Sequence, residues 1–212
     1  MGLKEDIKQT LTNHGSTISI RRTPANVVEV YDTEPIYQAS KPFRLEHIVQ
    51  ITSPFDSVLI VGDLADDVLG EDTYLIVHSD AEIINREIIS RNIVSYKTNC
   101  TVDIKRESKT GKGYNPTVVW TDVKTDLPCV VDDTAYAAKL DDSPIPYQNI
   151  QEKVIYLYVP TTVGAKVGDR VHIKSGSFGN TADGTMFYEV TTIDYYTFLG
   201  ISILHTKEDS RS

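Results

Sequence analysis

The chain has 212 residues, of which 40% are hydrophobic and 24% are charged, ordinary values for a globular protein with a packed core. Its formal net charge is −9, which argues against a broad surface for gripping DNA, because such a surface needs clustered Lys and Arg. No apolar run approaches the roughly 18–20 residues that span a bilayer, and neither a secretory signal nor an N-terminal lipid anchor is expected.

Residues 3–13 place Leu3, Ile7 and Leu11 at four-residue spacing, which predicts a short amphipathic helix. The helix is expected to end at Asn13-His14-Gly15. Two roles remain open for it: docking on a neighbouring subunit, or capping its own domain.

After this helix, short segments rich in Val, Ile, Tyr and Thr alternate with turn residues, which is typical of a β-sandwich or barrel. The expected strands are 17–22, 26–31, 47–53, 57–61, 73–78, 101–106, 117–123, 127–132, 153–159, 170–174, 186–193 and 197–205. Residues 79–92 carry Ile pairs that suit an amphipathic helix or a β-branched strand equally well. The predicted fold class is mainly β: two tandem small β-barrels or sandwiches with a short N-terminal helix.

Short motifs of the first half recur in the same order in the second half. The Val-Gly-Asp of residues 61–63 recurs at 167–169, and each copy follows a proline at the same distance. The matches are 17–22 with 101–106 at an offset of 84 residues, 27–34 with 118–125 at 91, 61–63 with 167–169 at 106, and Tyr74 with Tyr188 and Asp80 with Asp194 at 114.

Each increase in offset falls in a loop-like segment, namely 107–116, 132–149 and 175–184. Because loops tolerate added length, this pattern favours an internal duplication. The predicted domains are 1–98, with the helix and a first β-domain, and 99–212, with a second β-domain. The alternative is that β-proteins reuse a small set of turns, with each Gly-Asp only shaping the start of a strand.

The sequence indicates no enzyme. The five histidines (His14, His47, His78, His172 and His205) lack metal-ligand spacing. His78 and Asp80 would share one face of a strand with Ser79 opposite, so a Ser-His-Asp triad is not expected. The glycines of 175–184 lack the spacing of a phosphate-binding loop.

The acidic residues Asp63, Asp66, Asp67, Glu71 and Asp72 are the best candidates for a calcium site, but their spacing is not that of a calcium loop. A solvated acidic loop is the preferred interpretation. Cys100 and Cys129 are expected to be small core residues on strands. The basic pairs 21–22 and 105–106 are interpreted as inter-subunit salt bridges or solvated strand ends. No catalytic, cofactor or metal residues are therefore predicted.

Residues 101–206 contain, in order, a basic strand, a Gly-rich hairpin, a strand with Trp120, Gly168-Asp169-Arg170-Val171, and Tyr188-Glu189-Val190. In this they resemble the head-closure (stopper) and head–tail connector proteins of tailed bacteriophages. That resemblance implies small β-barrels forming a ring beneath the portal, and a long loop, here 132–149 or 107–116, reaching into the channel. Family members usually carry one such domain, whereas two are predicted here.

The resulting expectation is a structural neck protein of a phage virion, assembled in the host bacterial cytoplasm. It would form a six-fold or pseudo-six-fold homo-oligomeric ring, contact portal or adaptor and tail proteins, and let DNA pass without specific binding. The alternatives are a tail-completion or baseplate component, a two-domain adhesin or carbohydrate-binding module that uses surface tyrosines, and a calcium-dependent accessory domain of an enzyme.

Overall fold

The computed structural model describes residues 2–22, 27–35, 48–68, 70–110, 117–133, 155–176 and 187–211. The chain divides into two compact units. The first comprises Met1–Thr98 with Phe198–Ile201, and the second comprises Asn99–Thr197 with Ser202–Ser212.

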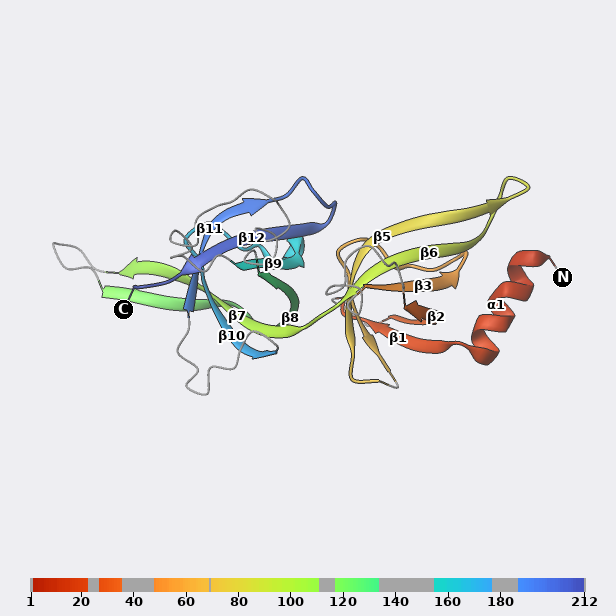
Figure 1. Cartoon of the computed structure of the whole chain (residues 1–212), viewed down its shortest axis with the longest axis horizontal. Helices are drawn as coiled ribbons and strands as arrows, with labels where there is room; N and C mark the ends of the chain where they lie inside the picture. Colours follow the sequence, from red (N-terminus) through yellow and green to blue (C-terminus); the bar gives the residue numbers. More distant parts are fainter. Residues whose placement is uncertain are drawn as a thin grey trace, which may run out of the picture. The chain divides into compact units, whose positions relative to one another are not determined.

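The first part of the chain contains the helix α1 (Leu3–His14) and the strands β1 (Ser16–Ile20), β2 (Val27–Pro35), β3 (Ile48–Pro54), β4 (Leu64–Asp67), β5 (Thr73–Ile84) and β6 (Glu87–Lys97) (Figure 1). The second part contains β7 (Cys100–Thr110), β8 (Thr117–Asp133), β9 (Ile155–Pro160), the short 3-10 helix η3 (Thr161–Val163), β10 (Arg170–Gly176), β11 (Phe187–Asp194) and β12 (Ile201–Glu208). Within the described ranges, no helix combines the length and apolar character needed to cross a membrane.

The strands form two closed antiparallel barrels. In the first barrel the order is β1-β2-β3-β6-β5-β4, and β4 pairs with β1. In the second barrel the order, read from β7, is β7-β8-β9-β12-β11-β10, and β10 pairs with β7. Counted from the first strand of each barrel, the two orders are the same. The predicted fold class, two tandem small β-barrels with a short N-terminal helix, is confirmed.

The sequence matches at offsets of 84 and 114 residues join equivalent core positions of the two barrels. The match of 27–34 with 118–125 at an offset of 91 is wrong, because Ile20 pairs with Val27 whereas its counterpart Ile104 pairs with Lys124, an offset of 97. Ile18 and Ile20 of β1 are fully buried, as are Val102 and Ile104 of β7 at an offset of 84 residues. Tyr74 and Tyr188, at an offset of 114, are buried core residues of β5 and β11. The two barrels have the same strand order and equivalent core positions. This favours an internal duplication over the alternative that β-proteins reuse a small set of turns.

Residues 79–92 form the end of a long hairpin, so the strand alternative is correct and the helix alternative is wrong. Asn85 and Arg86 have φ values of 51° and 70° and lie between β5 and β6. Two successive positive φ angles are the mark of a two-residue type I′ turn. Ile83 pairs with Ile88 across the hairpin, which puts the two Ile pairs on facing strands.

Two other strand predictions need correction. Residues 57–61 are not a strand, because the following Gly62, with φ 90°, folds this segment into a turn, and β4 begins only at Leu64. Residues 117–123 and 127–132 belong to one strand, β8, whose Asp126 has φ 49° and whose pairing with β7 is irregular at Val102–Lys105.

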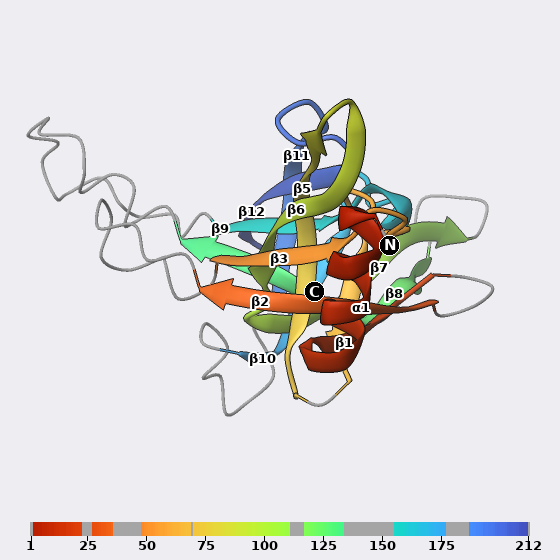
Figure 2. The ribbon, with the colours of Figure 1, turned by 90° about the vertical axis from the view of Figure 1, so that its right-hand side faces the viewer.

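The helix α1 lies against β2, β3 and β6 of its own barrel (Figures 1 and 2). Leu11 is buried, and the Lys8 ammonium pairs with Asp56 and lies 5.7 Å from the centre of the Phe55 ring. Lys4 forms a 3.5 Å ion pair with Glu87, which joins the start of the helix to the β5–β6 hairpin. The helix therefore has the second of its two expected roles.

Candidate functional site

The repeated Gly-Asp forms the same arginine clasp in each barrel. In the second barrel, Arg106 Nε and Nη2 each donate a 2.8 Å hydrogen bond to one carboxylate oxygen of Asp169. Arg106 Nη2 also donates to the Gly164 carbonyl, and the Lys166 N–H donates to Asp169 at 2.7 Å. The Asp169 side chain is only 2% exposed, and hydrogen bonding to it raises the pKa of Arg106.

In the first barrel, Arg22 binds Asp63 through Nε, at 3.0 Å, and through Nη2. Arg22 Nη2 also donates to the Val58 carbonyl, and the Ile60 N–H donates to Asp63 at 2.9 Å. Each donor and acceptor has its counterpart in the second barrel. Arg22 and Arg106 are themselves matched at the offset of 84 residues.

The glycine before each aspartate has a geometric role in the clasp. Gly62 and Gly168 have φ values of 90° and 88°, a backbone conformation that residues with a Cβ adopt at a cost. The Gly62 N–H donates a 2.8 Å hydrogen bond to the Ile76 carbonyl of β5, and the Gly168 N–H donates a 2.8 Å hydrogen bond to the Val190 carbonyl of β11. We therefore interpret the repeated Gly-Asp motif as a structural element that stabilises barrel closure, not as a reactive site.

The interpretation of the basic pairs as inter-subunit bridges or solvated strand ends is wrong for Arg22 and Arg106. Both guanidinium groups are engaged by a buried carboxylate of the same barrel, because pairing of the first strand with the fourth brings each arginine against the turn before the fourth strand. Arg21 likewise pairs with Asp66 at 2.6 Å, and Lys105 with Asp122 at 3.7 Å.

The acidic residues of 62–73 do not converge. Asp63 binds Arg22, whereas Asp66 accepts hydrogen bonds from Arg21 and from Thr73. Asp72 forms a 2.7 Å pair with Lys97. Within the described part of the chain, no group of three or more His, Cys, Asp or Glu side chains could hold a metal ion. Most of these carboxylates are paired with cations of the first barrel, so the expectation of a solvated acidic loop needs correction.

His78 and Asp80 share one face of β5, as predicted, and their side chains meet at 2.8 Å. Both are exposed, whereas Ser79 points to the opposite face and its buried Oγ has no hydrogen-bond partner among the described residues. A nucleophile, a base and an acid therefore do not come together here.

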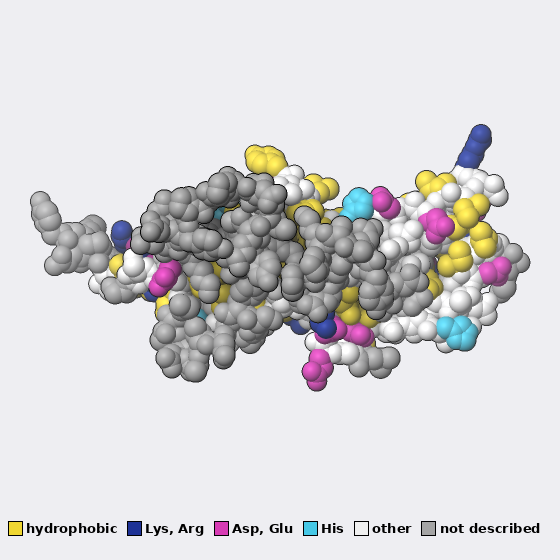
Figure 3. Space-filling model, viewed as in Figure 1, with side chains coloured by type: hydrophobic (Ala, Val, Ile, Leu, Met, Phe, Trp, Pro, Cys, Tyr) yellow, Lys and Arg dark blue, Asp and Glu magenta, His cyan; other side chains and the backbone are white. Residues whose placement is uncertain are grey.

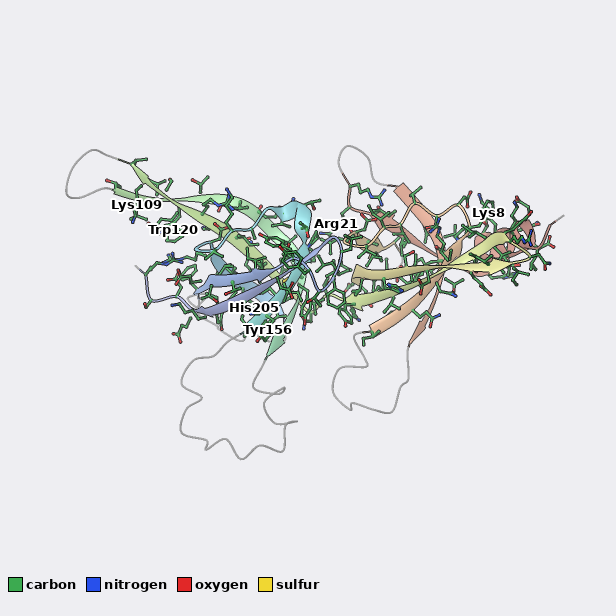
Figure 4. The ribbon with its side chains drawn as sticks, turned by 90° about the horizontal axis from the view of Figure 1, so that it is seen from above. Lys8, Arg21, Lys109, Trp120, Tyr156 and His205 are labelled. Atoms are coloured by element: carbon green, nitrogen blue, oxygen red, sulfur yellow. The ribbon has the colours of Figure 1, made fainter. Side chains whose placement is uncertain are left out.

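The other histidines that the structure describes lie apart from one another. His14 ends α1, His172 packs on Phe187 with ring centres 5.0 Å apart, and His205 meets the Tyr156 ring edge-on at 4.6 Å (Figure 4). His47 lies outside the described residues, as do most of 132–149 and 175–184 and the tip of 107–116, residues 111–116.

Cys100 and Cys129 are buried on strands, as expected for core residues. The sequence did not indicate that they face each other. Their sulfur atoms are 3.2 Å apart.

Trp120 of the second barrel lies in a cluster of charged side chains that stabilises the barrel. Trp120 (Figure 4) lies 4.0 Å from the guanidinium carbon of Arg170 and 5.3 Å from that of Arg211. Both arginines bind the buried Asp209, Arg170 at 2.7 Å and Arg211 at 2.8 Å. Burial alone would raise the pKa of Asp209, but hydrogen bonds from the arginines outweigh it and lower the pKa to about 2. This C-terminal cluster fixes residues 209–211 to the barrel and covers Trp120.

Among the described residues of the first barrel, several exposed apolar side chains lie at the end of the β5–β6 hairpin. Ile83, Ile84 and Ile88 are 62%, 40% and 37% exposed, and Leu3 of the adjoining helix is exposed as well. Figure 3 shows hydrophobic side chains gathered at this end of the barrel. Ile83 and Ile88 are cross-strand partners on one face of the hairpin, and Ile84 is on the other face; we call these three residues and Leu3 the hairpin patch. Its sequence signal was the two Ile pairs flanking Asn85-Arg86, which reasoning from periodicity left unresolved.

Comparison of the chain with protein-family models, with curated proteins and with solved structures found no match.

Proposed function

We propose that this protein is a non-enzymatic assembly component of a tailed-bacteriophage particle, a connector whose copies form a ring between the capsid portal and the tail. The observation that carries the proposal is the tandem pair of closed barrels with one strand order. Charged groups that the structure describes help to hold each barrel together, as in the two arginine clasps and the C-terminal cluster. A barrel used as a building block needs stable side-chain contacts more than a reactive pocket.

The hairpin patch supplies a surface for subunit contact. Exposed apolar groups that lie together on a small protein mark a site of association, because covering them removes apolar area from water. We propose a second copy of the chain as the occupant. Arg86 at the hairpin turn is exposed, and a chain of net charge −9 offers it many carboxylates. The acidic balance would also keep DNA from adhering to the ring as it passes.

The test is the mass of the particle in solution. Light scattering after size-exclusion chromatography, over a range of concentrations and with added portal or tail-tube protein, should reveal a closed oligomer of six copies, or of three with pseudo-six-fold symmetry. The double variant Ile83→Ser with Ile88→Ser should shift the protein toward monomer. The matched control is Val68→Ser, since Val68 is an exposed apolar residue of the same barrel outside the patch. A strict monomer that joins neither partner would refute the proposal.

A carbohydrate-binding module is the second candidate, and one observation favours it. Tyr196 is 95% exposed and Tyr195 is also exposed, and flat exposed rings can stack on sugars. Trp120 does not serve this purpose, because two guanidinium groups cover it. Binding on a glycan array that is lost in Tyr196→Ala would support this candidate and weaken the first.

A further inference from the structure

Cys100 and Cys129 occupy directly opposite positions on neighbouring antiparallel strands. They are partners in the register of β7 and β8, and 29 residues separate them in the chain. Both side chains are buried, and the two sulfur atoms lie 3.2 Å apart. Each sulfur is thus the close neighbour of the other.

The residue before Cys100 fixes this register. The Asn99 N–H donates a 3.1 Å hydrogen bond to the Cys129 carbonyl. The Asn99 side chain donates to the Val131 carbonyl at 2.9 Å and accepts from the Val131 N–H at 2.8 Å. Asn99 therefore forms hydrogen bonds to Cys129 and Val131 of β8. A shift in the register between β7 and β8 that would separate the cysteines must break these bonds.

The backbone geometry suits a covalent bond. Directly opposite residues of an antiparallel pair have Cα atoms about 4.5–5.5 Å apart. Disulfides accept Cα separations of about 4.4–6.8 Å. Joining these two sulfur atoms therefore needs a side-chain adjustment of little more than one ångström and no movement of the strands.

We propose that Cys100 and Cys129 are a disulfide-forming site, and that a low-molecular-weight disulfide such as oxidised glutathione converts them into a cross-strand bond between β7 and β8. The Cys100 thiolate attacks one glutathione sulfur, forms a mixed disulfide and releases one glutathione thiolate. The Cys129 thiolate then attacks the Cys100 sulfur, forms the internal disulfide and releases the second glutathione. Two thiol protons are lost, two cysteines are oxidised, and one glutathione disulfide is reduced to two thiols.

Oxidation should be faster during folding than after it. Burial and the neighbouring Cys100 raise the pKa of the Cys129 thiol, which keeps it protonated in the closed barrel. Because the thiolate is the attacking form, the step in which Cys129 attacks is slow in the folded barrel, whereas the unfolded chain exposes both sulfur atoms to the oxidant. The bond once formed is shielded by the same burial from reducing agents.

The experiment is refolding of the full chain in buffer containing oxidised glutathione, followed by denaturation and alkylation of the remaining thiols. Intact-mass measurement should find both cysteines protected, no bound glutathione and a mass lower by two hydrogens than that of the reduced protein. Non-reducing electrophoresis should show a monomer. The oxidised protein should melt higher than the reduced protein, by on the order of 10 °C for the transition of the second barrel.

The wild-type chain is the main subject, because Cys→Ser variants place a hydroxyl in the core and can fold poorly. Cys129→Ser serves as the matched control and should show no internal protection, with Cys100 either alkylated or carrying glutathione. Two alkylated cysteines after oxidative refolding, a disulfide between chains, or equal melting of the oxidised and reduced forms would each overturn the proposal.

Discussion

Replacing Asp169 by alanine should destabilise the second barrel selectively. The substitution removes the acceptor of two charged hydrogen bonds from Arg106, both 2.8 Å long, and of the 2.7 Å bond from the Lys166 N–H. It also takes away the group that fixes the turn before β10. Arg106 itself is about one-third exposed, so water can solvate the guanidinium after the change.

The expected loss follows from these contacts. Breaking a buried, hydrogen-bonded ion pair costs about 3–5 kcal/mol, and partial exposure of Arg106 places this case toward the lower end. For a barrel of this size, about 3 kcal/mol lowers the melting temperature by roughly 12–20 °C. The matched variant Asp63→Ala should destabilise the first barrel by a similar amount, since it breaks the equivalent bonds from Arg22 and Ile60.

The assay is hydrogen exchange measured by mass spectrometry, combined with denaturant unfolding. Asp169→Ala should increase exchange across β7 and β10, and Asp63→Ala across β1 and β4. Arg106→Met combined with Asp169→Ala should cost less than the sum of the two single changes, because they remove one interaction. A loss below about 1 kcal/mol in both aspartate variants would refute the closing role of the clasp.

Three further outcomes follow from single residues. The pKa of Asp209 falls from 3.8 to about 2 on folding, so its contribution of about 2 kcal/mol to stability is complete above pH 4 and is lost as the pH falls through about 2. Asp209→Asn should remove this contribution at neutral pH. The free energy of unfolding, measured with denaturant at several pH values, should then fall less steeply toward acid pH than in the wild type. Gly168→Ala should cost about 1–2 kcal/mol through its φ of 88° alone, because an added Cβ would meet nothing within 4 Å, and Gly168→Asn should cost less. Leu11→Ala should lower the unfolding free energy of the first barrel by about 2 kcal/mol without affecting the second, which separate unfolding transitions would reveal.

The sequence was sufficient to predict the structural features that repeat along the chain. Alternating apolar residues predicted the barrel strands, and the offsets of 84, 106 and 114 residues identified positions that are equivalent in the two barrels. The clasp could not be foreseen, because Arg22 and Asp63 are 41 residues apart and meet only when β4 pairs with β1. Pairing across a closed barrel depends on the register of all its strands, which local patterns do not specify.

The errors arose where turn geometry overrode β propensity. Residues 57–61, four of them apolar, resemble a strand, but the carboxylate of Asp63 accepts a hydrogen bond from the Ile60 N–H and holds the segment in a turn. The hairpin turn Asn85-Arg86 escaped notice because arginine rarely adopts a positive φ. The facing of Cys100 and Cys129 was likewise set by strand register, which the spacing of two cysteines does not reveal.

Closure of the barrels limits how this protein can join another. Every strand of the two cylinders has a hydrogen-bonded neighbour on each side over part of its length, so within the described residues an open edge is left only where a strand extends past a neighbour, as at the end of β5. Such a molecule resists runaway sheet growth even at a high local concentration. Side chains are therefore the main means by which it can recognise its neighbours.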